Sequence, residues 1–151
     1  MIAIIQRAER ASVVADGVKS GSIDKGFLVL LGVNENDTAA EAELLARKTA
    51  ALRIFCDEND KMNLSLIDID GGALVVSNFT LCADTKKGNR PSFIGAMEPV
   101  EADRLYKLFC EQLKQNGVKR VETGVFGADM KIDVCCDGPV TITLNTDTWR
   151  K

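Results

Sequence analysis

The chain has 151 residues, a length that fits one domain with a hydrophobic core of ordinary size. Apolar residues make up 46% of it and charged residues 27%, which is typical of a globular protein rather than a disordered one. Histidine is absent, which excludes Ser-His-Asp and Cys-His catalysis, histidine-ligated zinc and an imidazole proton shuttle. The formal net charge of −3 gives no global basic field that would recruit DNA or RNA, so any RNA contact has to be local.

The cysteines are odd in number and show no CxxC spacing, which fits neither a disulfide framework nor a zinc site. They are Cys56, Cys82, Cys110, Cys135 and Cys136. We expect reduced thiols and no metal. The first residues lack the basic segment of a secretory signal, and the longest apolar run, residues 27–33, is far shorter than the ~18 residues that a membrane span needs. The sequence therefore predicts a soluble, cytoplasmic protein with no membrane partner.

The first half of the chain predicts three strands and a helix. Residues 1–5 and 11–15 are β-branched and apolar, which favours two short strands. Residues 27–33 form a continuous apolar run of strand length, which indicates a strand buried on both faces. A helix over residues 38–52 follows, because this segment begins with the Thr-x-x-Glu spacing of a capping box and continues rich in alanine and leucine.

The middle of the chain predicts one strand and one helix. Residues 73–81 have the clearest strand pattern of the sequence. Asp68 and Asp70 precede this strand, and because two glycines follow them at once, we interpret them as a tight hairpin turn rather than a metal site. A second helix is expected from Pro99, a residue suited to a first helical position, to just before Gly117.

The last third predicts three strands, over residues 118–122, 128–135 and 140–144. The resulting order, β-β-β-α-β-α-β-β-β, indicates an α+β or mixed α/β domain. No linker, repeat or low-complexity block is visible, so residues 1–151 are expected to form a single domain. The order does not match a doubly wound nucleotide-binding fold, and neither GxGxxG nor GxxxxGK is present.

Polar residues interrupt the strand at 73–81 where it approaches a loop: Ser77-Asn78-Phe79-Thr80. Such residues line a site or, equally well, form hydrogen-bonded edge positions. Neither hydroxyl can be activated by a histidine, so a nucleophilic role would need a lysine, a carboxylate or the substrate itself as base.

A proline breaks the strand-like sequence near the C-terminus, in Asp137-Gly138-Pro139. A plain turn explains this segment; the functional alternative is that backbone carbonyls at Gly138 and Pro139 face a ligand. Cys135-Cys136 just before it suggests a cysteine hydrolase, but the carboxylate of Asp137 disfavours the thiolate that such an enzyme needs.

Two motifs resemble the signatures of the D-aminoacyl-tRNA deacylases. Residues 77–81 resemble the family's Ser-Gln-Phe-Thr-Leu, and residues 136–141 resemble its Asn-x-Gly-Pro-Val-Thr. Asn78 replaces the usual Gln, and Cys136 replaces the usual Asn. Further segments similar to the family occur in the same order and extend the resemblance over essentially the whole chain: residues 5–7, 10–13, 61–64, 88–93 and 127–130.

The resemblance implies hydrolysis of the ester between a D-amino acid and the terminal adenosine of tRNA, with mischarged glycine as a further substrate. It implies a homodimer with its sites at the interface, and mixed and antiparallel sheets with two helices packed on one side. The vicinal 2′-hydroxyl of the tRNA would help to activate water, while the protein supplies orientation and an oxyanion site, which explains the absence of histidine. No cofactor is implied.

The resemblance also assigns roles to residues of this chain. Phe79, Thr80, Ser77 and Asn78 would form the catalytic segment, with backbone N–H groups around Phe79 and Thr80 as oxyanion donors. The chirality filter would be Gly138 and Pro139, in cis, entering the pocket of the other subunit and held by Arg7.

Two further sets of residues would contact the tRNA. Phe126 and Met130 would line the adenosine pocket, with core packing as the structural alternative. Lys86, Lys87 and Arg90 would face tRNA phosphates, with a solvated loop as the alternative.

Two other functions stay open. A catalytically inactive dimeric relative that binds tRNA or a small molecule is suggested by the departures at Asn78 and Cys136. An editing enzyme for an L-amino acid would need a different Gly-Pro geometry, and Val140-Thr141 after the proline fits the D-specific group better.

Overall fold

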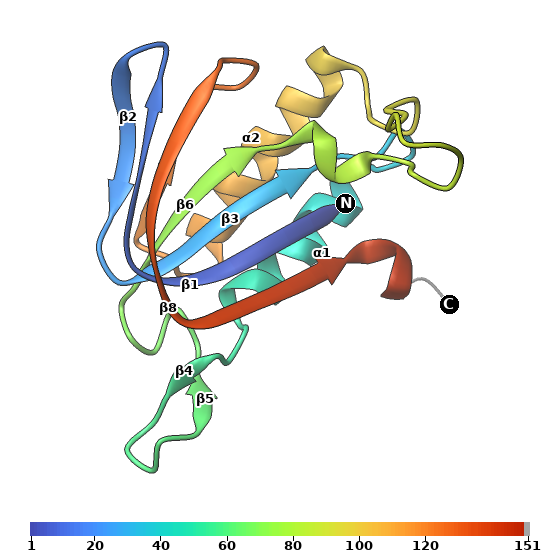
Figure 1. Ribbon diagram of the computed structural model, residues 1–151. Coiled ribbons are helices and arrows are strands. Elements are labelled where there is room, and N and C mark those ends of the chain that lie inside the picture. The colour runs from blue at the N-terminus through green and yellow to red at the C-terminus, as the bar shows by residue number, and fades with distance from the viewer. Residues whose placement is uncertain (150–151) are drawn as a thin grey trace.

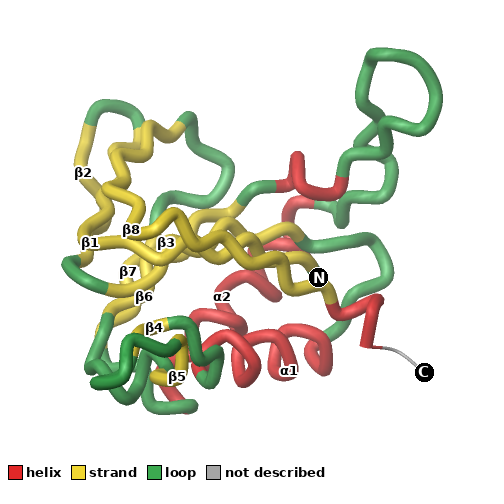
Figure 2. Tube along the Cα trace, turned by 60° about the horizontal axis from the view of Figure 1, so that its bottom comes forward, coloured by secondary structure: helices red, strands yellow, loops and turns green. Residues whose placement is uncertain are grey.

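The computed structural model describes residues 1–149, which form a mixed β-sheet with both long helices on one of its faces (Figures 1 and 2). The strand order is β2-β1-β3-β6-β7, and a further strand, β8, pairs with β1. The strands are β1 (Ile2–Ala15), β2 (Val18–Ile23), β3 (Gly26–Gly32), β4 (Phe55–Cys56), β5 (Met62–Leu64), β6 (Gly72–Ser77), β7 (Arg120–Thr123) and β8 (Met130–Asn145). The helices are α1 (Ala39–Ala50) and α2 (Pro99–Gln115), with two short 3₁₀ helices, η1 (Phe79–Cys82) and η2 (Thr146–Trp149). The predicted mixed α/β class with two helices is confirmed.

The two strands predicted at residues 1–5 and 11–15 are one strand, β1. Its first half pairs with β3 and its second half with β2, both antiparallel. Residues 6–10 between them are mostly polar, but the strand continues through this stretch because its backbone keeps ladder partners in β3 and β8. Strand β2 was not predicted, because its sequence, Val-Lys-Ser-Gly-Ser-Ile, carries little apolar periodicity.

The centre of the sheet is parallel. Strand β3 pairs in parallel with β6, and β6 pairs in parallel with β7. The chain passes through α1 between β3 and β6, and through α2 between β6 and β7. Within β3 only Leu30 is not fully buried, which confirms the prediction of a strand covered on both faces.

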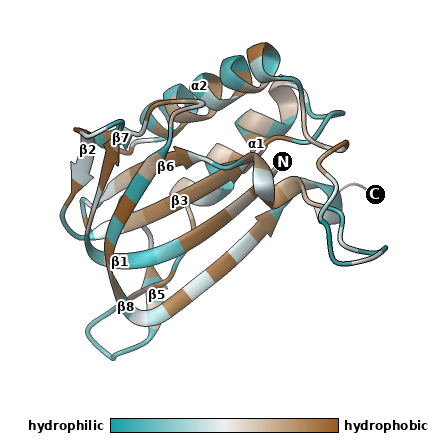
Figure 3. Cartoon of the chain, turned by 45° about the horizontal axis from the view of Figure 1, so that its top comes forward, coloured by the Kyte–Doolittle hydropathy of each residue, from teal (hydrophilic) through white to brown (hydrophobic). Residues whose placement is uncertain are grey.

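Three predicted boundaries are corrected by the structure. The strand expected over residues 73–81 ends at Ser77, where the chain turns into η1. The strands expected at 128–135 and 140–144 are one long strand, β8, which keeps pairing with β1 across two register shifts. Hydrophobic and hydrophilic residues alternate along much of β8 (Figure 3). Asp68 lies in a turn, but not in a hairpin, because β5 before it pairs with β4 whereas β6 after it joins the main sheet.

Both helices begin where their sequences predict. Thr38 forms the expected capping box with Glu41, and Pro99 occupies the first turn of α2. The main core lies between the helices and the sheet, and its helical part consists of Ala42, Leu45, Ala46, Ala50, Ala102, Leu105, Tyr106, Phe109, Cys110 and Leu113. Among residues 1–149, no helix is long and apolar enough to cross a membrane.

Candidate active site

A cavity of about 700 Å³ lies at the carboxyl ends of the parallel strands β3 and β6. Carboxyl ends of neighbouring parallel strands meet at one sheet edge, where α/β folds commonly place their ligands. All six residues predicted for the catalytic segment and the adenosine pocket line this one cavity: Ser77, Asn78, Phe79, Thr80, Phe126 and Met130. The fold thus brings together two segments that lie about fifty positions apart in the sequence.

The catalytic segment lies where β6 changes into η1. The Asn78 amide donates a hydrogen bond to the Leu31 carbonyl oxygen at 2.8 Å, which fixes the end of the strand against β3. Phe79 is the first residue of η1, and N–H groups at the start of a helix lack acceptors within that helix. The Thr80 hydroxyl donates a hydrogen bond to the Asn78 side-chain oxygen, so the two side chains orient each other. Donors at Phe79 and Thr80 therefore lie beside the cavity.

Aromatic and aliphatic side chains lie exposed beside the cavity. The Phe79 ring is 60% exposed and meets Phe93 edge-to-face, with ring centroids 5.1 Å apart. Ile94, next in the chain, is 86% exposed. Exposed apolar side chains of this size, next to a cavity with hydrogen-bonding groups, are typical of a ligand-binding surface.

A buried tyrosine, Tyr106 of α2, also lines the cavity. The Tyr106 hydroxyl donates to the Val75 carbonyl oxygen at 2.7 Å, and its ring packs against Phe126 with centroids 5.9 Å apart. Burial raises the pKa of Tyr106 well above its ordinary value, so the phenol stays neutral. Sequence reasoning missed Tyr106 as a site residue, although its position one turn after Ala102 on the apolar side of α2 is a signal that it faces the sheet.

The predicted filter residues lie outside this chain's own cavity, because none of Arg7, Gly138 and Pro139 is among the residues that line it. The Gly138-Pro139 peptide bond is cis, and Gly138 has a φ of +126°. The buried Arg7 guanidinium donates to the Asp137 carbonyl oxygen at 3.1 Å and to the Ile54 carbonyl oxygen at 2.8 Å. Its Nε also lies 3.2 Å from the Asp137 carboxylate. Arg7 is therefore bonded to the residue directly before Gly138-Pro139, and its role in holding a filter stays a prediction.

The three predicted phosphate-binding residues lie in a separate loop. Lys86, Lys87 and Arg90 are exposed and do not line the cavity. The loop is closed by reciprocal backbone hydrogen bonds between Asp84 and Ser92, at 2.8 and 2.9 Å. It projects from the sheet beyond η1 (Figure 2). Its cationic groups are thus available to a large anionic ligand that reaches past the cavity.

All five cysteines are free thiols, as predicted. Cys136, which departs from the family signature, is exposed and lies 3.8 Å from the Gln6 side-chain oxygen. Burial, with a smaller effect of Asp37, raises the pKa of Cys82, which disfavours a thiolate there. Within residues 1–149, no three or more acidic, histidine or cysteine side chains are grouped so as to hold a metal ion.

Comparison with known proteins gives one consistent family. Residues 4–145 match the family described as D-Tyr-tRNA(Tyr) deacylase. A D-aminoacyl-tRNA deacylase of Yersinia enterocolitica is 55% identical over 144 residues, covering 95% of this chain and 99% of the relative. That of Koribacter versatilis is 52% identical over 146 residues, covering 97% of each chain.

Solved structures agree in fold. The c-Myc DNA Unwinding Element Binding Protein superposes with a TM-score of 0.90 at 41% identity, over 96% of this chain and 98% of that one. A structure described as a probable eukaryotic D-amino acid tRNA deacylase superposes with a TM-score of 0.82 over 95% of this chain and 97% of that one. Its identity is 15%, so this second likeness concerns the fold alone.

Proposed function

The chain belongs to the D-Tyr-tRNA(Tyr) deacylase family, and from this premise we propose that its cavity hydrolyses the ester bond of D-aminoacyl-tRNA and spares L-aminoacyl-tRNA. As a member of this family the chain is an enzyme, a hydrolase that acts on aminoacyl-tRNA, and its role is the proofreading of charged tRNA. The observation that carries the proposal is the convergence of the 77–80 segment with Phe126 and Met130 on one cavity.

Chemistry at this site relies on orientation and charge stabilisation. An aminoacyl ester is already activated, and the neighbouring 2′-hydroxyl of the tRNA can position or activate water. N–H groups at Phe79 and Thr80 would stabilise the oxyanion that develops on the ester carbonyl. Because the Thr80 hydroxyl donates to Asn78, we assign it an orienting role rather than that of a nucleophile.

Chirality would be read by a second copy of the chain. Gly138 and Pro139 lie outside their own cavity, which supports their insertion into the cavity of a partner in a homodimer. Their carbonyl oxygens would occupy the space that an L side chain needs, whereas a D side chain points away. Glycine has no side chain to exclude, so glycine mischarged on tRNA would also be hydrolysed.

Contacts with the tRNA would come from two places. Phe126 and Met130 would hold the terminal adenosine, since an aromatic ring can stack on a base. Lys86, Lys87 and Arg90 would contact phosphates further along the acceptor strand, because their loop projects past the cavity.

The direct test is hydrolysis of matched D-Tyr-tRNA, L-Tyr-tRNA and Gly-tRNA by the purified protein with a chelator present. We expect rapid release of D-Tyr and glycine with L-Tyr spared, and no effect of the chelator. Release of L-Tyr at the same rate as D-Tyr would overturn the filter.

A second candidate function is that of an inactive relative that binds charged tRNA or a small molecule, and only Asn78 and Cys136 favour it. Binding of D-Tyr-tRNA without turnover would support this alternative and contradict the hydrolase. Asn78→Gln and Cys136→Asn would then be the first reversions to make, since they restore the family's usual residues.

A further inference from the structure

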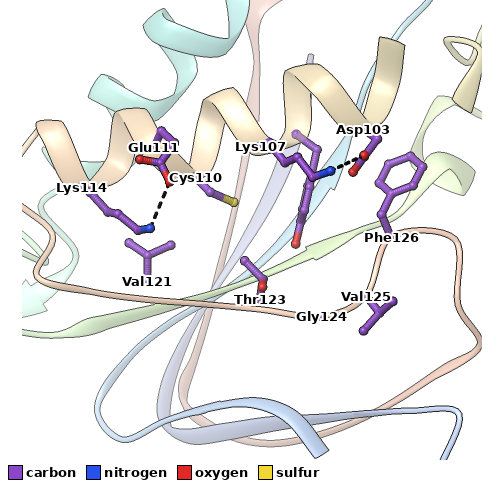
Figure 4. A pocket seen from close by; sticks show the side chains of 11 residues that line it. Asp103, Lys107, Cys110, Glu111, Lys114, Val121, Thr123, Gly124, Val125 and Phe126 are labelled. Carbon is purple, nitrogen blue, oxygen red and sulfur yellow. Dashed lines mark hydrogen bonds and ion pairs between the residues drawn. The ribbon is translucent and has the colours of Figure 1, made fainter. Parts of the chain in front are cut away.

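A second cavity lies between α2 and β7 (Figure 4). Its volume is about 550 Å³, within the range of about 300–1,000 Å³ that small-molecule pockets occupy. Tyr106 and Phe126 line both cavities. The two cavities therefore share a wall, and that wall includes Phe126, one of the two residues against which we place the terminal adenosine.

We propose that this α2–β7 cavity binds the penultimate nucleotide of the tRNA, the cytidine that precedes the terminal adenosine. The inference rests on the proposed function, because it takes the adenosine in the first cavity as its starting point. Every tRNA ends in a single-stranded CCA, so the nucleotide joined to the adenosine by one phosphate has to lie within reach of the first cavity. The α2–β7 cavity is a neighbouring recess of suitable size.

The edge of the α2–β7 cavity carries two cations. Lys107 and Lys114 lie two turns apart on α2, with side chains 71% and 50% exposed. Each pairs with a carboxylate about one turn away, Asp103 at 2.6 Å and Glu111 at 3.1 Å (Figure 4). Exposed pairs of this kind contribute little free energy, so either ammonium group can turn to a phosphate at small cost.

The α2–β7 cavity is also lined by apolar side chains that a nucleobase can contact. Phe126 and Val125 come from the loop after β7, and Val125 is 47% exposed. Single-stranded RNA is bound by stacking on aromatic faces combined with basic groups along the backbone, and both are present here. Burial raises the pKa of Cys110 in the floor to about 12, so the thiol is neutral and the cavity is equipped for binding rather than for thiolate chemistry.

Asp103 supplies a feature that can tell cytosine from uracil. Its Oδ2 accepts from Lys107, while its Oδ1 is buried and has no hydrogen-bond partner. A carboxylate oxygen that lacks a donor is the partner that the exocyclic amine of cytosine requires. Uracil presents a carbonyl oxygen at the same position and would leave Asp103 unpaired. The cavity therefore matches the conserved cytidine of the tRNA end.

The experiment compares kcat/KM for three D-tyrosyl esters: a minihelix RNA ending in CCA, the same RNA ending in CUA, and D-tyrosyl-adenosine. We expect the wild type to prefer CCA over CUA about tenfold, the size of one good base contact. Asp103→Asn should abolish that preference, because its amide can face either base. Lys107→Ala and Lys114→Ala should each lower the ratio of kcat/KM for CCA RNA to that for D-tyrosyl-adenosine severalfold.

Lys119→Ala is the matched control. Lys119 is also an exposed, paired lysine, 3.0 Å from Asp70, but it lines neither cavity, so its variant should keep both wild-type ratios. Unchanged ratios in all three α2 variants would overturn the cytidine site while leaving the deacylase intact. Failure of the wild type to hydrolyse D-tyrosyl-adenosine and both RNAs would instead overturn the proposed function itself.

Discussion

Arg7 is a buried residue that contacts the chain directly before the Gly138-Pro139 segment. It lies in the middle of β1 and is buried, yet its guanidinium has carbonyl partners on two other segments, at Ile54 and Asp137. A buried charge is tolerated only where such partners compensate for its lost hydration, so both the arginine and its acceptors are held in place. The rigidity that the proposed steric filter needs would thus start from the Arg7 side chain.

Gly138 is the residue whose replacement tests this filter. Its φ of +126° disfavours any L side chain, and a Cβ added there would lie 2.8 Å from the Val140 amide nitrogen. We therefore expect Gly138→Ala to shift the segment and to lower the ratio of D-Tyr-tRNA to L-Tyr-tRNA hydrolysis at least tenfold, consistent with strain of about 1–3 kcal/mol. Initial rates with the two charged tRNAs measure this ratio.

Gly17→Ala is the control for backbone strain alone. Gly17 also has a positive φ, +82°, but a Cβ there would meet no atom within 4 Å. This variant should lose some stability and keep the wild-type ratio of the two rates. A Gly138→Ala protein with full activity and full rejection of L-Tyr-tRNA would show that Gly138 does not form the filter.

At the scale of residues, the sequence could point to a candidate site where a short motif carries the resemblance. The 77–80 segment was found by its resemblance to a family signature, and Phe126 and Met130 by the resemblance of the whole chain. The structure places them on one cavity, while their roles stay predictions. Tyr106 was missed, because its place on the apolar side of α2 indicates only that it faces the sheet and not that it lines a site. Its role depends on the Val75 carbonyl oxygen, 31 positions away, which no pattern within the helix encodes.

At the scale of elements, α1 and α2 were predicted with nearly correct ends because capping signals are local. Thr38, Glu41 and Pro99 act within one turn of their helix and need no tertiary partner to be recognised. Strands were predicted less well. Whether β1 continues through Arg7, or whether β2 exists at all, depends on ladder partners elsewhere in the chain.

The capping box of α1 gives a stability prediction. Thr38 Oγ1 accepts from the Ala40 amide at 3.3 Å, and Glu41 accepts from the Thr38 amide at 2.8 Å. Thr38→Ala removes the side-chain acceptor, so the free energy of unfolding should fall by about 1 kcal/mol. Urea denaturation followed by circular dichroism measures the change, with the exposed loop variant Thr85→Ala as control. Equal midpoints for the two variants would contradict this role of the cap.

At the scale of the whole molecule, the core between α2 and the sheet contains two weak acids that stay protonated. Burial raises the pKa of Tyr106 far above its ordinary 10.0 and the pKa of Cys110 from 9.0 to about 12. Above pH 9 the unfolded chain releases protons that the folded protein retains. The free energy of unfolding should therefore fall as the pH rises from 9 towards 12, and these two groups should cause no change below pH 8.

This alkaline loss of stability can be followed with one chromophore, because Tyr106 is the chain's single tyrosine. The near-ultraviolet absorbance of tyrosinate should appear only together with the loss of helical circular dichroism. In denaturant the same absorbance should rise around the ordinary pKa of 10.0. Tyrosinate that forms near pH 10 while the helices persist would show that the ring is not enclosed as described.

The pairing of β1 with β8 has a consequence for how the protein is made. Ile2 opposes Asn145 and Ala15 opposes Met130, so β1 can pair with β8 only after the whole segment between them has been synthesised. Until then one long edge of β1 lies open to pairing with other nascent chains. The Gly138-Pro139 segment belongs to β8, whereas Arg7, which bonds to the residue before it, belongs to β1. The pairing of β8 with β1 therefore both covers the open edge of β1 and completes the proposed filter.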